Sequence, residues 1–425
     1  MLKRPGRGNP IALLRRLPAA LRLLVVTQFA FNVGFYLVVP FLAAHLAQDL
    51  ALAGWAVGLI LGLRTFCQQG LFFLGGALAD RFGVKQIILI GVAVRIAGFV
   101  GLGLARDPWS VTLGVALIGF AAALFSPAVE SALTVWAGEL EAKGGPRRTE
   151  VIGLEVMAAK MGTIVGPLLG GILLVVPFEA TCFVAAGVFG VILLAQLRWL
   201  PAEARASAPS RVGSSLRDVL ANRHFLLFAL IHCTYLLSYN QLYLAIPVEL
   251  ERIGAPSANI TWLFALAAIV VLVLQLPISR AVARWRISRV LGWGYALITL
   301  GFLGVAGFAP FTPLPGVLSY LPSALFVVGL HLGQILVLPA ARAAVADLAG
   351  GQRMGTYLGM LASIGGAAVL VGSTAIGFIL PLSAEPSGLA PVPWLALAAV
   401  SAASTLGVVA FCRRRSEPTP TKGKR

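Results

Sequence analysis

Long apolar stretches alternate with short polar segments along almost the whole chain. Each stretch is about as long as the roughly 20 residues that a helix needs to cross a hydrocarbon core of about 30 Å. Because unpaired backbone groups are costly in lipid, and because the stretches are too long for barrel strands, the pattern predicts transmembrane helices. We place twelve of them, at residues 20–46, 54–79, 84–105, 109–137, 150–176, 179–200, 223–247, 257–279, 288–309, 316–345, 354–381 and 391–412.

The longest polar stretch between these spans divides them into two sets of six. We therefore expect an N-terminal six-helix bundle (1–200), a cytoplasmic central loop (201–222), a C-terminal six-helix bundle (223–412) and a basic cytoplasmic tail (413–425). Short motifs recur between the halves: Tyr36-Leu-Val-Val-Pro40 returns as Tyr243-Leu-Ala-Ile-Pro247. The repetition predicts an all-α integral membrane protein of two pseudo-symmetric bundles, with a central binding site and alternating access.

Composition and charge agree with a membrane protein. Hydrophobic residues make up 59% of the chain and charged residues 12%, against about 25% charged in soluble domains. The net charge of +17 would suggest nucleic acid in a soluble protein, but the bases gather in loops on one side of the even-numbered topology. The opposite loops hold only Arg106 and Arg252, beside several acids. The positive-inside rule then predicts a multi-pass protein of the bacterial plasma (inner) membrane with both termini cytoplasmic and no nucleic-acid partner.

Catalytic and metal-binding patterns are not found in the sequence. The four cysteines have no CxxC spacing and the four histidines are dispersed, at Cys67, Cys182, Cys233 and Cys412 and at His45, His224, His232 and His331. There is also no HExxH, DDxxD or nucleotide-binding GxxxxGK[ST] pattern. We therefore expect no disulfide framework, metal, cofactor or enzyme activity.

The loop between the second and third spans carries a specific motif, Gly76-Ala-Leu-Ala-Asp80-Arg81-Phe-Gly83-Val-Lys85. It resembles the GxLaDrxGrK loop of major facilitator transporters. The resemblance implies a twelve-helix fold in which Asp80 lies against the start of the eleventh helix and locks the cytoplasmic side shut, helped by the positive end of that helix. Gly83 is expected to make the tight turn. The second half repeats the motif only in part, with Arg284 where the first half has Asp80.

Two further resemblances narrow the family. The fifth span contains Gly162-Thr-Ile-Val-Gly166-Pro167-Leu-Leu-Gly170-Gly171, which is similar to the GxxxGPxxGG pattern of members that export by antiport and that pack this helix against the eighth. The segments 61–70 and 93–99 resemble MdtH-like multidrug exporters, in the drug:proton antiporter group. An arginine that this group often has four residues before a helix-four glycine is missing, because Val115 stands there. The usual proton route is therefore in doubt.

Charges at membrane depth are expensive and are candidates for function. The bases are Arg64, Arg95, Lys160 and Arg342, and the acids are Glu130, Glu155 and Asp347. We hypothesise that Glu130 and Arg342 pair when the cytoplasmic side closes, and that protonation of Glu130 releases this gate. The alternative is a static pair of either residue with Lys160 or a loop charge. The excess of positive charge could attract an anionic substrate, although snorkelling and structural pairing explain it equally well.

The implied fold lines the cavity with spans one, four, seven and ten. Its candidate residues are polar or aromatic: Gln28, Asn32, Tyr36, Tyr235, Tyr239, Asn240, Tyr243, His331 and Gln334. Aromatic rings with a few amides suit amphipathic molecules, although each residue could serve helix packing instead. The function predicted is export of drugs or natural products by a monomer in exchange for protons. The alternative is uptake or exchange of a small anionic metabolite.

Overall fold

The computed structural model describes residues 10–201, 219–350 and 354–416, apart from the side chains of Asp80 and of residues 412–416. Within these ranges twelve segments are helical, long and apolar enough to cross a membrane, which confirms the prediction from the hydrophobic pattern. The predicted central loop and basic tail lie mostly outside the described residues.

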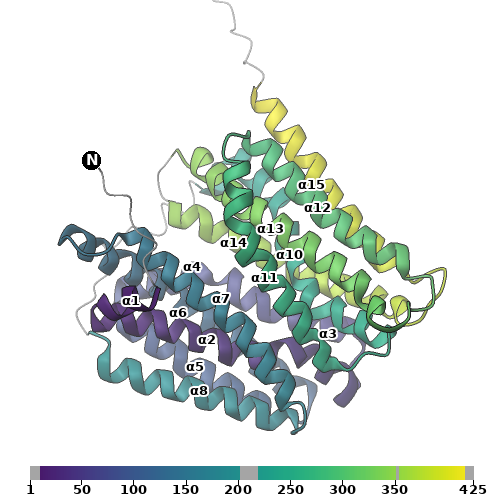
Figure 1. Ribbon diagram of the computed structural model, residues 1–425, viewed down its shortest axis with the longest axis horizontal. Helices are drawn as coiled ribbons and strands as arrows, with labels where there is room; N and C mark the ends of the chain where they lie inside the picture. The colour runs from purple at the N-terminus through teal and green to yellow at the C-terminus, as the bar shows by residue number, and fades with distance from the viewer. Residues whose placement is uncertain (1–9, 202–218, 351–353, 417–425) are drawn as a thin grey trace, which may run out of the picture.

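The helices of the first half follow one another with short turns (Figure 1). They are α1 (Pro10–Arg16), α2 (Ala19–Ala44), α3 (Gly54–Thr65), α4 (Phe72–Phe82), α5 (Val84–Leu104), α6 (Pro108–Ala142), α7 (Arg148–Leu173) and α8 (Phe178–Trp199). The π-helical turn Phe66–Gly70 joins α3 and α4 into one span. Such a turn inserts a residue into the helix and is often found at functional sites.

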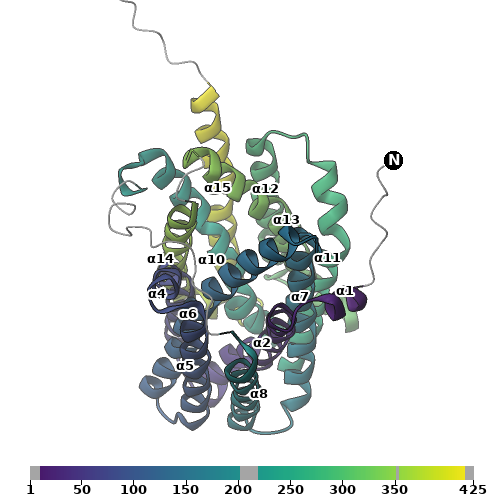
Figure 2. The same cartoon turned by 90° about the vertical axis from the view of Figure 1, so that its left-hand side faces the viewer.

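The second half repeats the plan. Its helices are α10 (Arg223–Arg252), α11 (Ile260–Ala281), α12 (Ile287–Phe308), α13 (Leu321–Leu348), α14 (Met354–Ile379) and α15 (Val392–Ser416). Figures 1 and 2 show the two sets of helices as two bundles that meet at one end and diverge toward the other. This arrangement is the expected pair of six-helix bundles.

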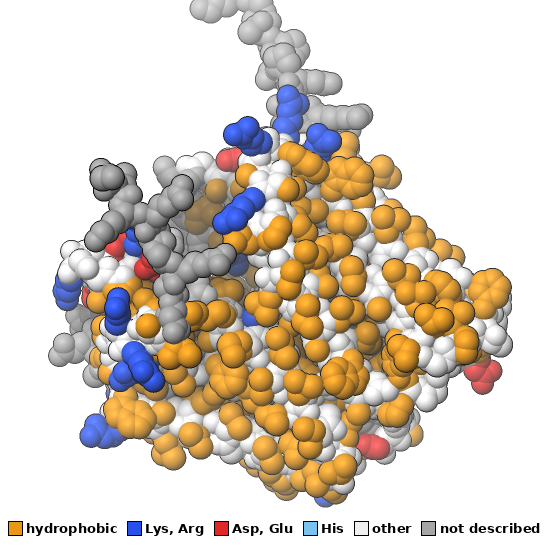
Figure 3. Space-filling model, in the orientation of Figure 1, with side chains coloured by type: hydrophobic (Ala, Val, Ile, Leu, Met, Phe, Trp, Pro, Cys, Tyr) orange, Lys and Arg blue, Asp and Glu red, His pale blue; other side chains and the backbone are white. Residues whose placement is uncertain are grey.

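The turns between the helices lie at two ends of the molecule. The termini end carries α1, the turns at Gly83 and Gly144 and the end of α15, whereas the far end carries the turns at Gly254 and Gly316. In Figure 3 the basic side chains gather mainly toward the termini end. The far end carries Asp107, which caps α6 by accepting hydrogen bonds from two backbone N–H groups. The Ser110 hydroxyl also donates to this carboxylate and holds the pKa of Asp107 below its usual range.

Both arginines near the far-end turns form ion pairs. Arg106 pairs with Glu179 near the surface. Arg252 forms a two-point contact with Glu249, with nitrogen–oxygen distances of 2.7 and 2.8 Å, and both side chains are buried. Neither arginine therefore adds a free positive charge to this end, and the contrast with the basic termini end is increased.

Close helix approaches hold the far end shut. A Cβ atom on Gly58 of α3 would lie 2.2 Å from the backbone oxygen of Ser373 on α14, and one on Gly377 would lie 2.3 Å from the oxygen of Gly54. These positions accept only glycine without backbone movement. The two bundles are thus in direct backbone contact here.

The glycine motif of α7 packs differently from the expectation. Gly162, Gly166 and Gly170 face α2 and not the eighth span, since their Cβ positions would meet the backbone or side chains of residues 29–41. Only the end of the motif reaches α11, where the Thr261 hydroxyl donates to the Pro167 carbonyl at 2.9 Å. The spacing of small residues predicted close helix contact correctly, but spacing alone cannot say which neighbour fills the groove.

Candidate functional site

A small pocket lies between the bundles near the middle of the molecule. Its volume is about 20 Å³, and its walls come from α2, α7, α10, α11 and α13. The lining residues are Tyr36, Lys160, Thr163, Tyr239, Phe264, Ala267, Ala268 and His331. None of these residues is acidic. We call it the central pocket, and its largely aromatic wall carries one lysine and one histidine.

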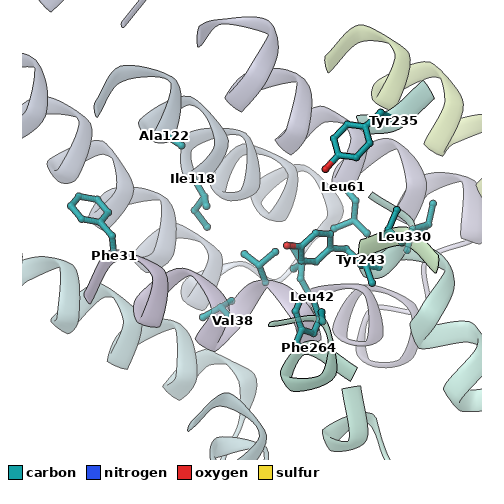
Figure 4. Packing of buried hydrophobic residues seen from close by; sticks show 14 of the residues in the cluster. Phe31, Val38, Leu42, Leu61, Ile118, Ala122, Tyr235, Tyr243, Phe264 and Leu330 are labelled. Carbon is teal, nitrogen blue, oxygen red and sulfur yellow. The ribbon is translucent and has the colours of Figure 1, made fainter. Parts of the chain in front are cut away.

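Two tyrosines related by the internal repeat meet beside this pocket. Tyr243 on α10 donates a hydrogen bond to the hydroxyl of Tyr36 on α2 at 3.4 Å, and the two residues are 207 positions apart. This separation is the offset between the Tyr-Leu-x-x-Pro motifs, so residues in equivalent places touch, as expected on the pseudo-symmetry axis. Figure 4 shows Tyr243 beside Phe264 and Leu42, and the two rings are 5.6 Å apart.

Arg64 is buried behind this tyrosine pair, with 4% of its surface exposed. Its guanidinium lies 5.2 Å from the Tyr243 ring and 5.4 Å from the Phe35 ring, within cation–π range. One nitrogen donates to the Thr65 hydroxyl at 3.0 Å, but Nε is buried without a partner. No carboxylate of the described residues pairs with this charge.

Polar contacts link Arg64 to the second bundle. The Thr65 hydroxyl donates to the Asn240 side-chain oxygen at 3.0 Å, and the Asn240 amide donates to the Ser373 hydroxyl at 2.9 Å. All three residues are buried. Asn240 therefore joins the bundles at this point and does not line the pocket.

Arg95 is held in a separate aromatic cage within the first bundle. Its guanidinium lies 5.0–5.3 Å from the rings of Phe35, Phe125 and Phe189. One nitrogen donates to the Ile118 carbonyl at 3.1 Å, and Nε again has no partner. Arg95 and Arg64 both lie over Phe35. Two cations are thus close together in the interior, and no acid among the described side chains forms an ion pair with either of them.

Lys160 and His331 are the two ionisable wall residues of the pocket other than tyrosine. Lys160 is partly buried, and no ion pair to it is found among the described residues. His331 is 4% exposed and its Nδ1 donates to the Val327 carbonyl at 2.8 Å. This bond fixes the tautomer of the neutral ring and leaves Nε2 as the free nitrogen.

The predicted gate residues lie on the termini side of the pocket. Glu130 on α6 and Arg342 on α13 are both exposed, and they form no ion pair here. They remain within electrostatic range of each other. Glu155 is half-buried and Asp347 is exposed on the same side. Since the gate is expected to pair only after closure, the Glu130–Arg342 hypothesis stays a prediction.

A second cavity lies on the far side of the tyrosine pair. It measures about 240 Å³ and is bounded by both bundles, with Pro40 and Pro247 from the repeated motif among its wall residues. Most of its lining is apolar, apart from Gln48, Glu251 and Ser257. This far-side cavity is therefore separated from the central pocket by Tyr36, Tyr243 and Phe264.

The remaining predicted cavity residues do not line the pocket. Asn32 donates from its amide to the Gln28 carbonyl, and Tyr235 is buried between His232 and Tyr239. Gln334 has a buried side-chain oxygen with no partner. The walls that the sequence did not reveal are Thr163, Phe264, Ala267 and Ala268 on the fifth and eighth spans. They are small or apolar residues within apolar helices, so composition gives no sign of them.

The loop motif is only partly described. Gly83 has φ of 93°, which confirms the expected glycine turn. Lys85 donates to the carbonyls of Leu197 and Leu200, at the end of α8, at 3.3 and 2.6 Å. The exposed Arg81 lies over the Phe82 ring. The side chain of Asp80 lies outside the described residues, so its predicted role stays a prediction.

Comparisons with known proteins agree on one family. Residues 24–333 match the model of the Major Facilitator Superfamily. An uncharacterized MFS-type transporter of Mycobacterium tuberculosis is 36% identical over 409 residues, 95% of this chain and 94% of that protein. The multidrug resistance protein MdtH of Salmonella typhi is 30% identical, covering 88% and 89%. The crystal structure of the nucleoside transporter NupG superposes with a TM-score of 0.76 at 14% identity, covering 93% and 100%.

Proposed function

The chain belongs to the major facilitator superfamily of transporters, and from that premise we propose that it exports amphipathic molecules in exchange for protons. The observation that carries the proposal is the aromatic pocket on the pseudo-symmetry axis, separated from the far end by Tyr36 and Tyr243. Rings supply apolar contact area, while Lys160, Thr163 and His331 orient the ligand. The MdtH relatives support a multidrug class of substrate.

The difference between the two ends supports a mechanism of alternating access. The far end is closed by backbone contact between α3 and α14, whereas Glu130 and Arg342 are exposed toward the termini end. Rocking of the bundles would separate the first contact and bring the two charges together. In this proposal the termini end faces the cytoplasm of a bacterium, supported by its excess of bases. The substrate then enters from the cytoplasm and leaves at the far end.

The proton is assigned to the Glu130–Arg342 gate. An ionised Glu130 attracts Arg342 and favours closure on the termini side, whereas a protonated Glu130 loses that attraction. A proton that binds the two conformations with different affinity shifts their populations by that difference. Glu130 lies close enough to Glu155 to act on it electrostatically. The gate thus provides a coupling route that does not need the arginine missing at Val115.

The test uses purified protein in liposomes with an imposed pH gradient. A panel of cationic, neutral and anionic amphiphiles is added, and proton movement is followed with an internal pH dye. We expect amphiphile-triggered proton movement in the wild type and a loss of at least about tenfold in Glu130→Gln. Glu139→Gln, on the exposed end of α6, is the matched control. Silence of the wild type across the panel would contradict export of amphiphiles, and full activity of Glu130→Gln would remove Glu130 from the coupling route.

A further inference from the structure

We propose that the central pocket selects substrates by an anionic group, such as a carboxylate, which Lys160 and His331 bind. The inference rests on the proposed function and adds the charge class of the substrate. Three features of the molecule support it: the composition of the pocket wall, the charge behind this wall and the size of the pocket.

The wall offers several hydrogen-bond donors and no acid. Lys160 contributes an ammonium group, and Tyr36 and Tyr239 contribute hydroxyl groups, whereas the Thr163 hydroxyl already donates to the Lys160 backbone carbonyl at 2.7 Å. His331 has Nδ1 committed to the Val327 carbonyl, so a protonated ring would offer Nε2 as a further donor. A carboxylate accepts hydrogen bonds and cannot donate them, which matches this set. A cationic ligand would find no carboxylate among the wall residues.

The charge behind the wall has the same sign. Arg64 is almost fully buried and stacks on the Tyr243 ring, whose hydroxyl contacts Tyr36 of the pocket. Its Nε has no partner, and no acid of the described residues neutralises it. An unpaired buried charge is costly. An anion in the adjacent pocket would offset part of that cost through the intervening tyrosines.

The size of the pocket fits a head group and not a whole drug. A volume of about 20 Å³ holds about one water-sized group. In this conformation the pocket therefore has room for no more than the end of a larger molecule. The apolar remainder would lie toward the exposed termini side, or toward the apolar far-side cavity of about 240 Å³ once the tyrosine pair separates.

Anion binding also constrains the coupling. An anion on Lys160 and His331 stabilises their protonated forms, so substrate and proton would favour each other at this site. Exchange in opposite directions requires competition instead. The exchanged proton must therefore bind elsewhere, and Glu130 in the termini-side gate meets that requirement through conformational change.

The test compares binding of three probes that differ only in charge: a naphthyl-alkyl carboxylate, its neutral amide and the corresponding ammonium compound. Equilibrium binding is measured on the full-length protein in detergent, so transport is not needed for the result. We expect the wild type to bind the carboxylate at least about tenfold more tightly than the amide, and the ammonium compound most weakly. Lys160→Met should abolish this preference, and Lys160→Arg should keep most of it.

Controls separate charge selection from general damage. Lys143→Met, at an exposed lysine after α6, should bind like the wild type. Lys160→Gln is a second neutral variant in case the methionine variant does not fold, and size-exclusion profiles check both. Equal binding of carboxylate and amide by the wild type, or a preference that survives in a folded neutral variant, would overturn the inference. If all three probes are transported at equal rates, the proposed export function stands and the anion site is rejected. If the carboxylate binds selectively but is not transported, the anion site stands and the proposed export function is rejected.

Discussion

The two ends of this transporter are built from different interactions. The far end closes through backbone contacts at Gly58 and Gly377 and contains the fully buried Glu249–Arg252 pair. The termini end has Glu130 and Arg342 exposed and unpaired. Close packing acts over a few tenths of an ångström and does not depend on pH, whereas exposed charges act over several ångströms and respond to protonation. Protonation of Glu130 can therefore act directly on the termini end, whereas the contact that closes the far end is uncharged, although the ion pairs His45–Asp49 and Glu249–Arg252 also lie there.

Removing the acid of the buried pair should give the largest effect. Glu249→Gln would leave the Arg252 charge buried without a counter-ion, which costs about 3–5 kcal/mol in comparable buried pairs. We expect a clear fall in the free energy of unfolding, measured by steric trapping or by thermal denaturation in detergent. Glu179→Gln is the matched control, because its partner Arg106 is 74% exposed and can return to water. Equal losses in both variants would show that burial does not distinguish the two pairs.

Adding one methyl group at the closed end should have the next largest effect. In Gly58→Ala the new Cβ would lie 2.2 Å from the Ser373 oxygen, so α3 and α14 must separate. Overpacking of this kind costs about 1–3 kcal/mol, and here it would also favour opening of the far end. We expect slower transport and greater labelling of a cysteine placed in the far-side cavity.

A glycine with open space around it provides the control for this substitution. The Cβ position of Gly101 on α5 has no neighbour within 4 Å, so Gly101→Ala should be neutral or slightly stabilising, as is usual for alanine in a helix. If Gly58→Ala transports at the wild-type rate and gives no extra labelling, the contact between α3 and α14 is not what keeps the far end closed.

The sequence predicted the fold well because membrane helices follow from length and hydrophobicity alone. It also drew attention to Tyr36, Tyr239 and His331, which the structure places on the pocket wall, because polar and aromatic side chains stand out in apolar helices. Asn240 stands out in the same way, but its side chain accepts a hydrogen bond from Thr65 across the bundle interface and donates one to Ser373 within its own bundle. A polar residue in a membrane needs a partner, and the sequence does not reveal whether that partner is protein or ligand.

Other features depended on three-dimensional packing that no local pattern encodes. Phe264 and Ala267 line the pocket although they are ordinary residues of an apolar helix. The glycine motif beginning at Gly162 indicated a close contact but not that α2 would provide it. The hydrogen bond between Tyr36 and Tyr243 could have been anticipated, because repeat-related residues meet only near the symmetry axis.

Reversing the charges of the Glu130–Arg342 gate should have the smallest effect on stability. It is nevertheless the most informative change for the comparison of the two ends. Glu130 and Arg342 are both exposed in this conformation, so Glu130→Arg should barely change the free energy of unfolding. It should instead disfavour the conformation closed at the termini end, because two bases would then be brought together. We expect the rate of cross-linking between cysteines placed on α6 and α13 at that end to fall several-fold. Adding Arg342→Glu to Glu130→Arg restores a pair of opposite charges and should recover the cross-linking rate. If Arg342→Gln in the same background recovers the rate to the same extent, closure is governed by relief of repulsion and not by attraction between the two side chains.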